Sequence, residues 1–420
     1  MGDEVPSDLA GQTTDDANRQ SIGFRTAFAA MEVGARLGVL RSPGSLDTRA
    51  LGPAPSTEAG RTGLRQLLDA LDHESRLTGF GKLSVSWDLK RLLRNAAYAE
   101  RVAAEAASAG TDQIEAPLFI LGLPRSGTTF LHALLAADPD NLVPRVWQTI
   151  EPVPRPVDFN PRQDKAVRAV NRQLRMFAGF TPEFSAMHPI DADSPQECSE
   201  ITAHVFQSLR FDTTFRVPSY LNWLERHGHD DAFAFHRKFL ICLQQGLAAR
   251  RWVLKCPDHT FSLPEILRAY PDARFVIVHR DPIRVFASVA HLTEVLRRPF
   301  LHDIDPVEIG RQVVERWIEG AHRLVAFDRE ASVPESRKIN LRYEDLTADP
   351  LGTIRRVYGH FDIPFSAAAQ QAIRGEIEAK PRGGYPEHQR YMLGRFGIQM
   401  DMLTDGFRPY LDHFGIALAG

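Results

Sequence analysis

Residues 117–129 read PLFILGLPRSGTT, and this stretch decides how the rest of the chain is interpreted. Its first part, PLFILGL (117–123), is a short apolar run bounded by Pro and Gly, as expected of a strand buried on both faces. A helical pattern runs from Gly127 to about Ala137 and stops at Asp138-Pro139. The stretch therefore predicts a strand, a glycine-containing turn and a helix, in that order.

Three further apolar runs have the same texture: RWVLK (251–255), ARFVIVH (273–279) and KINLRY (338–343). Helical patterns follow them, for example over 283–296 and 351–361. Strands that alternate with helices predict a parallel sheet covered on both faces, which is a three-layer, P-loop-like α/β domain over 117–420. Residues from about 140 to 250 are mostly helical and rich in aromatic side chains, so they are predicted to form a helical insertion.

The first 116 residues have a different pattern. Residues 1–20 are polar and acidic and are predicted to form a disordered tail, whereas 21–116 are predicted to form a helical N-terminal extension. The extension is recognised from apolar residues spaced three and four apart, which mark packing faces of helices: Leu64, Leu67, Leu68 and Leu71, then Leu89, Leu92, Leu93 and Ala96.

Composition excludes several classes of protein. The 420 residues are 43% hydrophobic and 25% charged, with a net charge of -3, which argues against a nucleic-acid partner because no excess of basic residues is present to hold phosphates. The three cysteines have no metal-binding spacing and are too few for a disulfide framework. No signal peptide and no apolar run of 18 residues is found, so a cytoplasmic protein without a transmembrane segment is expected.

The turn after the first strand has the glycine spacing of a phosphate-binding loop. Gly122 and Gly127 fit G-x-x-x-x-G, and Thr129 stands where a P-loop has its Ser or Thr. Position 128, however, is Thr128 rather than Lys, and the cation is Arg125 inside the loop. This difference argues against a P-loop kinase or nucleoside-triphosphatase, which uses that Lys on the β- and γ-phosphates. An anion can still be held by the backbone N–H groups and the helix N-terminus.

With these residues in place, LPRSGTTFL (123–131) resembles the 5'-phosphosulfate-binding loop of the sulfotransferases that use 3'-phosphoadenosine 5'-phosphosulfate (PAPS), in the arginine form of tyrosylprotein and many bacterial members. The resemblance implies that the donor is bound by Arg125, Ser126, Gly127, Thr128 and Thr129. A second segment, VHRDPIRVFASVAH (278–291), is similar to the family's 3'-phosphate-binding segment and implies that Arg280 and Ser288 hold that phosphate.

Weaker matches extend the resemblance. LRYEDL (341–346) is similar to a family segment whose Tyr, here Tyr343, lies against the adenosine, and Arg382 begins a loose match to a late basic loop over the 3'-phosphate. By the same resemblance Lys255 would contact the transferring group and His259 would be the base, although these two residues are four apart here and two apart in cytosolic members.

Three carboxylates complete the set of candidates. Other branches of the family use a Glu soon after the first loop, and Glu151 is the local equivalent. Glu197 and Glu200 lie in the aromatic-rich segment and could line the acceptor site, although a solvated helix start explains each of them as well.

The implied function is transfer of a sulfuryl group from PAPS to a hydroxyl, with an amine as second choice, on a small-molecule or lipid acceptor, releasing 3'-phosphoadenosine 5'-phosphate (PAP). Cations of the protein would stabilise the charge, so no metal is expected. The acceptor side is assigned to the insertion at about 140–250. Two alternatives stay open: a P-loop kinase or nucleoside-triphosphatase, and a catalytically silent protein that binds nucleotide and partners. The sequence leaves the oligomeric state undecided.

Overall fold

The computed structural model describes residues 26–154, 159–180, 183, 190–248, 250–379 and 393–417. Among them, five strands form one parallel sheet in the order β2-β3-β1-β4-β5. The four strands predicted from apolar runs are present, and the two-residue β2 was not predicted because so short a strand leaves no pattern. The strands are β1 (Leu118–Leu121), β2 (Asn141–Leu142), β3 (Arg251–Lys255), β4 (Arg274–His279) and β5 (Lys338–Arg342).

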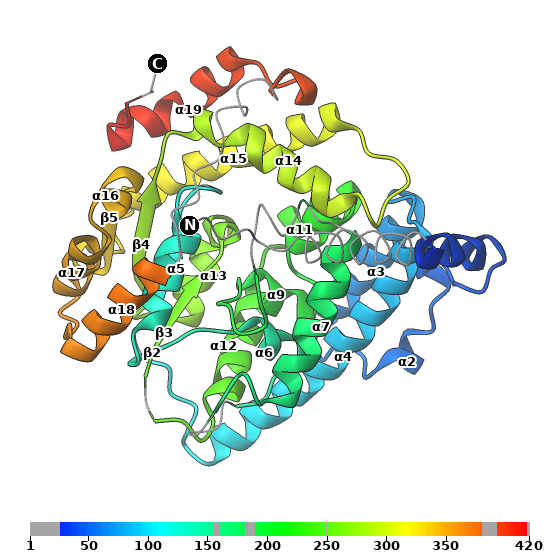
Figure 1. Cartoon of the computed structure of the whole chain (residues 1–420), viewed down its shortest axis with the longest axis horizontal. Helices are drawn as coiled ribbons and strands as arrows, with labels where there is room; N and C mark the ends of the chain where they lie inside the picture. Colours follow the sequence, from blue (N-terminus) through cyan, green and yellow to red (C-terminus); the bar gives the residue numbers. More distant parts are fainter. Residues whose placement is uncertain are drawn as a thin grey trace, which may run out of the picture.

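Both faces of the sheet are covered by helices. Alternate residues of each strand point to opposite faces and so enter different hydrophobic clusters. Leu118 and Ile120 of β1 lie in one hydrophobic cluster, whereas Phe119 and Leu121 lie in another. The first cluster is shared with α5 (Thr128–Ala137), α16 (Tyr343–Ala348), α17 (Pro350–His360) and α18 (Ala367–Ala379). The second is shared with α12 (Asp230–Gln244), α13 (Leu263–Ala269), α14 (Phe286–Arg297), α15 (Pro306–Asp328) and α19 (Met400–Phe414). The predicted three-layer α/β architecture is confirmed (Figure 1).

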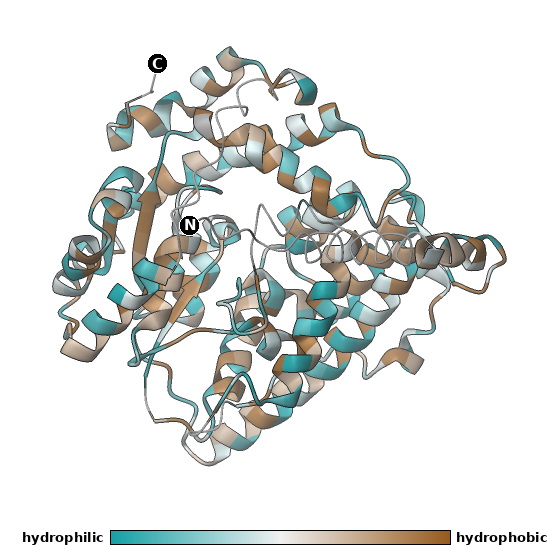
Figure 2. Ribbon diagram, in the orientation of Figure 1, coloured by the Kyte–Doolittle hydropathy of each residue, from teal (hydrophilic) through white to brown (hydrophobic). Residues whose placement is uncertain are grey.

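The two central strands, β1 and β4, are apolar over most of their length, as Figure 2 shows for the brown arrow of β4. In this strand Phe275 through Val278 are fully buried. A run of consecutive apolar residues is therefore the mark of a strand covered on both faces, as the sequence indicated.

The N-terminal region is helical where it is described. Residues 26–36 are helical, and they are followed by η1 (Pro43–Ser45), α2 (Thr48–Leu51), α3 (Glu58–His73) and α4 (Gly79–Ser108). The apolar stripes of α3 and α4 are buried against aromatic side chains of the 203–224 segment, including Phe206, Phe211 and Tyr220. Farther along, α4 packs on α12 and contributes Ala96 and Ala99 to the sheet-side core. A division of the chain at residue 116 stays a prediction, as does the disordered tail, which lies outside the described residues.

Where it is described, the insertion at about 140–250 is mostly helical apart from β2, with α6 (Val146–Ile150), α7 (Lys165–Phe180), α9 (Ser199–Thr202), η2 (Ala203–Val205), α10 (Arg210–Thr214), α11 (Pro218–His227) and α12. Shorter elements elsewhere are η3 (Pro257–Phe261), η4 (Pro282–Arg284), η5 (Glu335–Arg337) and η7 (Gly394–Phe396). None of the described helices is both long enough and apolar enough to cross a membrane. The cytoplasmic location stays a prediction.

Candidate active site

The phosphate-loop segment, residues 122–127, connects β1 to α5 and needs glycine at both ends. Gly122 has φ +147°, and a Cβ there would lie 2.5 Å from the carbonyl oxygen of Val278. Gly127 has φ +95°, and a Cβ there would lie 2.7 Å from the ring of Tyr343. Both values fall where L side chains are strained, so the tight turn and the close approach of β4 and Tyr343 explain the G-x-x-x-x-G spacing.

The carboxyl edge of the sheet brings the predicted site residues together. Lys255 ends β3, Arg280 directly follows β4, and Tyr343 directly follows β5. The loop follows β1, the strand that lies between β3 and β4. In open α/β sheets this edge, at the point where the strand order reverses, is the ligand-binding edge. Residues more than 200 positions apart in the sequence therefore share one site.

Arg280 joins the loop to Tyr343. Its Nη1 donates a hydrogen bond to the carbonyl oxygen of Arg125 (2.9 Å), and its guanidinium carbon lies 4.0 Å from the centre of the Tyr343 ring. The arginine is thus stacked on an aromatic face and held against the loop, which restricts its conformations. The sequence predicted roles for Arg125, Arg280 and Tyr343, and the structure places the three side by side.

Positive charge is concentrated at this point. Burial, together with the neighbouring Arg280, lowers the pKa of Arg125 to about 10, which still leaves the guanidinium charged at neutral pH. Two cations so close repel each other, and a bound anion relieves that repulsion. The site is therefore suited to a phosphate or a phosphosulfate.

Two predicted donor-binding hydroxyls are buried without a hydrogen-bond partner among the described residues. Ser126 is 1% exposed and Ser288 is 4% exposed, and the Oγ of each makes no hydrogen bond among the described residues. A buried hydroxyl without a partner is costly, and an anionic ligand would supply the missing acceptor. Thr128 is also buried, at the first turn of α5. The residues present therefore fit a phosphorylated nucleotide.

Lys255 is the most buried cation of the site, at 2% exposure. Its Nζ donates to Oγ1 of Thr129 (3.0 Å) and to Oε1 of Glu197 (2.5 Å). The structure thus connects two predicted site residues, Lys255 and Thr129, to one of the carboxylates named as lining candidates. Because Glu197 and Lys255 are 58 residues apart, no local pattern could have predicted this pair.

His259, the predicted base, lies in a different environment. The ring is 2% exposed in η3, and its centre is 5.1 Å from that of Phe119 and 5.9 Å from that of Phe233. Burial, followed by the nearby His236 and Lys255, holds its pKa well below the ordinary value. Neither ring nitrogen makes a hydrogen bond within the described part of the chain. This burial leaves the imidazole neutral but gives it little access to an acceptor.

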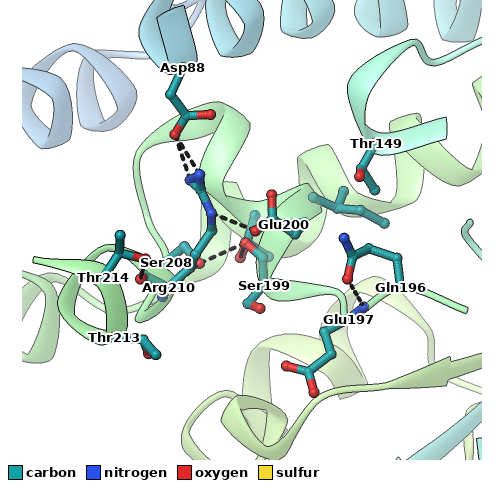
Figure 3. A network of polar contacts seen from close by, with 12 residues as sticks. Asp88, Thr149, Gln196, Glu197, Ser199, Glu200, Ser208, Arg210, Thr213 and Thr214 are labelled. Atoms are coloured by element: carbon teal, nitrogen blue, oxygen red, sulfur yellow. Dashed lines mark hydrogen bonds and ion pairs between the residues drawn. The ribbon is translucent and has the colours of Figure 1, made fainter. Parts of the chain in front are cut away.

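The remaining predicted residues lie in different places. Glu151 is exposed at the end of α6. Glu200 belongs to a cluster of ion pairs with Arg210, Arg91 and Asp88, in which it accepts from Nε of Arg210 at 2.6 Å (Figure 3). Arg382 lies outside the described residues.

A glycine-containing phosphate loop at the carboxyl edge of a parallel sheet places the chain in the P-loop-like α/β class. The model of the sulfotransferase family matches residues 117–367, which is more than half of the chain, and the chain belongs to that family. The matched range begins one residue before β1 and includes the loop, Lys255, Arg280 and Tyr343.

Several known proteins are similar to the chain. The omega-hydroxy-beta-dihydromenaquinone-9 sulfotransferases Stf3 of Mycobacterium bovis and Mycobacterium tuberculosis are each 29% identical over 256 residues, which is 59% of this chain and 63% of theirs. The chain thus matches less than two thirds of the length of these relatives.

Two crystal structures share the fold over most of the chain. Sulfotransferase STF1 from Mycobacterium tuberculosis has a TM-score of 0.72 at 27% identity, covering 91% of this chain and 98% of its own. Sulfotransferase STF9 from Mycobacterium avium has a TM-score of 0.76 at 26% identity, covering 87% and 94%. Because 91% and 87% of the chain are covered, the similarity to both structures extends well beyond the residues 117–367 that the family model matches.

Proposed function

We propose that the protein transfers the sulfuryl group of PAPS to a hydroxyl of a small-molecule or lipid acceptor and releases PAP. The observation that carries the proposal is the junction of Arg125, Arg280 and Tyr343, because it joins a phosphate loop to a second cation and an aromatic ring. A nucleotide with phosphates at two separate positions needs such a pair of cationic sites beside a surface for its base.

The residues take the following roles in this proposal. The backbone and side chains of Arg125, Ser126, Gly127, Thr128 and Thr129 hold the 5'-phosphosulfate, Arg280 and Ser288 hold the 3'-phosphate, and Tyr343 lies against the adenosine. Lys255 stabilises the negative charge that develops on the sulfuryl group during in-line transfer. A cation fixed in position before the reaction is suited to this task. PAPS supplies the activated sulfuryl group, and the protein supplies position and charge.

Two alternatives predict other chemistry. A P-loop kinase would need a cation at position 128, where this chain has a buried Thr128. A silent binding protein has no need for a lysine that is almost fully buried at the phosphate site, since burial of a charged group is costly in general. Membership in the sulfotransferase family supports the enzyme over the kinase.

The acceptor is proposed to be a hydroxylated small molecule or a lipid. The Stf3 relatives are named for a hydroxylated menaquinone, a lipid-like acceptor. An amine is the second choice, because the same in-line transfer would serve either nucleophile.

The proposed 3'-phosphate contact is tested by replacing Arg280 with alanine. We expect PAP to bind about 10- to 100-fold more weakly, because a charge-assisted hydrogen bond contributes about 1.5–3 kcal/mol. Titration calorimetry with PAP measures the change, and Arg408→Ala is the control, since Arg408 is exposed on α19. Unchanged PAP affinity in Arg280→Ala would remove the assignment.

A further inference from the structure

The segment that carries Glu197 is fixed on two sides. Pro195 forms an isolated bridge with Arg145, and the amide of Gln196 donates to the carbonyl oxygen of Pro144 (2.8 Å). On the other side, the amide of Cys198 donates to the carbonyl oxygen of Lys255 at the end of β3 (3.2 Å). The backbone therefore holds Glu197 beside Lys255 whichever way its side chain turns.

The side chain of Glu197 faces the lysine rather than the neighbouring ion-pair cluster. Figure 3 shows Glu200 directed toward Arg210 and Asp88, whereas Glu197 points away from them. Its Oε1 accepts from Nζ of Lys255 at 2.5 Å, and its Oε2 accepts from Sγ of Cys256 at 3.8 Å. Two glutamates three residues apart thus differ in role: one belongs to a structural network, and the other to the loop site.

Access distinguishes Glu197 from the groups around it. Its side chain is 33% exposed, whereas that of Lys255 is 2% exposed. Because Lys255 also contacts Thr129, in the first turn of the helix that follows the phosphate loop, a single side chain separates the carboxylate from that helix start. Glu197 therefore combines proximity to the loop with an open side, which the buried His259 lacks.

We propose that Glu197 is the general base that removes the proton from the acceptor hydroxyl, a role that rests on the proposed function. The acceptor oxygen forms a bond to sulfur, the bond between sulfur and the bridging phosphate oxygen breaks, and its electron pair stays on that oxygen. The acceptor proton moves to a carboxylate oxygen of Glu197. Lys255 is the positioning residue, since it fixes the carboxylate and lies toward the loop.

The charges around Glu197 are consistent with this role. Asp258 is a further acidic group near Glu197. Burial, and after it the charge of Glu197, raises the pKa of Asp258 to about 7, and Arg316 offsets part of this rise. An anion bound at the loop would compete with Glu197 for the charge of Lys255.

The test compares two acceptors in the presence of PAPS, with PAP formation as the readout. A primary alcohol with an apolar chain must lose a proton, whereas p-nitrophenol is largely ionised in an assay at about pH 8 and needs no base. Glu197→Gln should slow transfer to the alcohol by roughly a hundredfold to ten-thousandfold. Transfer to p-nitrophenol should stay within a few-fold of wild type, and so should the PAP affinity measured by calorimetry.

Matched variants keep the outcomes separate. Glu151→Gln and His259→Gln should not show the acceptor-dependent loss, and if either shows it while Glu197→Gln does not, the proposal is overturned. Equal losses for both acceptors in Glu197→Gln, with PAP affinity intact, would also overturn it. A wild-type protein that binds no PAP and transfers to neither acceptor would instead refute the proposed function itself.

Discussion

The Asp88→Ala variant is expected to unfold with about 3–5 kcal/mol less free energy than the wild type. Asp88 of α4 accepts hydrogen bonds from Arg91 (2.6 Å) and from Arg210 (2.8 Å). The side chains of the two arginines are 7% and 17% exposed, so removal of the carboxylate leaves two poorly solvated cations with Glu200 as the remaining acidic partner in the cluster. Urea unfolding at neutral pH measures the loss.

The pH dependence of this effect has a defined sign. Burial raises the pKa of Asp88, but the charges of Arg210 and Arg91 outweigh it, and the folded-state pKa is lowered. A lowered pKa stabilises the fold above the unfolded-state pKa, and that contribution disappears as the pH falls through the folded-state pKa. The difference between wild type and Asp88→Ala should therefore shrink in acid. Asp405→Ala, which breaks an exposed pair with Arg408, is the control and should cost less than about 1 kcal/mol.

If Asp88→Ala costs no more than that control, the cluster does not connect α4 to the insertion in the way described. The large expected loss of stability follows from the position of Arg210. This residue directly precedes Phe211, which belongs to the hydrophobic cluster shared by α3, α4 and the 203–224 segment. Loss of the pair would therefore disturb the packing between the N-terminal helices and the insertion.

Replacing Arg125 with alanine is expected to slow sulfuryl transfer by about 10²- to 10³-fold, the effect of removing one fixed donor from a developing negative charge. The side chain is half-buried, and the hydrogen bond from Arg280 to the carbonyl oxygen of Arg125 places the two cations in the same region. Arg125→Lys should recover part of the rate, because it keeps the charge but loses the two-pronged guanidinium.

Single-turnover rates with saturating PAPS separate this effect from weaker binding. A loss confined to PAPS affinity, with an unchanged rate once the donor is bound, would show that Arg125 only anchors the donor. Arg125 has a backbone φ of +65°, which few residues other than glycine adopt. Circular dichroism and PAP affinity should accompany the rates, because they detect a change of loop conformation in the variant.

The parts of the site that the sequence predicted lie on strand ends. Arg280 and Tyr343 each directly follow a predicted strand, and parallel strands bring their carboxyl ends to one edge, so the strand pattern placed them together while the family resemblance implied their roles. Gly122 and Gly127 were likewise readable, because each position requires a backbone that only glycine adopts freely.

The rest depended on contacts between distant segments. Glu197 lies in a helical insertion, and its approach to Lys255 is set by hydrogen bonds to residues 144 and 255, which no spacing in its own segment reveals. His259 is of a residue type that often acts as a catalytic base, but packing against Phe119 and Phe233 leaves its ring buried. Burial of a side chain in the core depends on tertiary packing, which the residues next to it in the sequence do not reveal.

The measurement that tests the central claim most directly is thermal unfolding with PAP or ATP at equal concentration and without added metal. If PAPS is the donor, PAP should raise the melting temperature clearly, since a ligand at about 100 times its Kd stabilises the folded state by about 2.7 kcal/mol. ATP lacks the 3'-phosphate that Arg280 and Ser288 are proposed to hold and should give a much smaller shift. A larger shift with ATP that requires magnesium, and no shift with PAP, would contradict the account and favour a kinase.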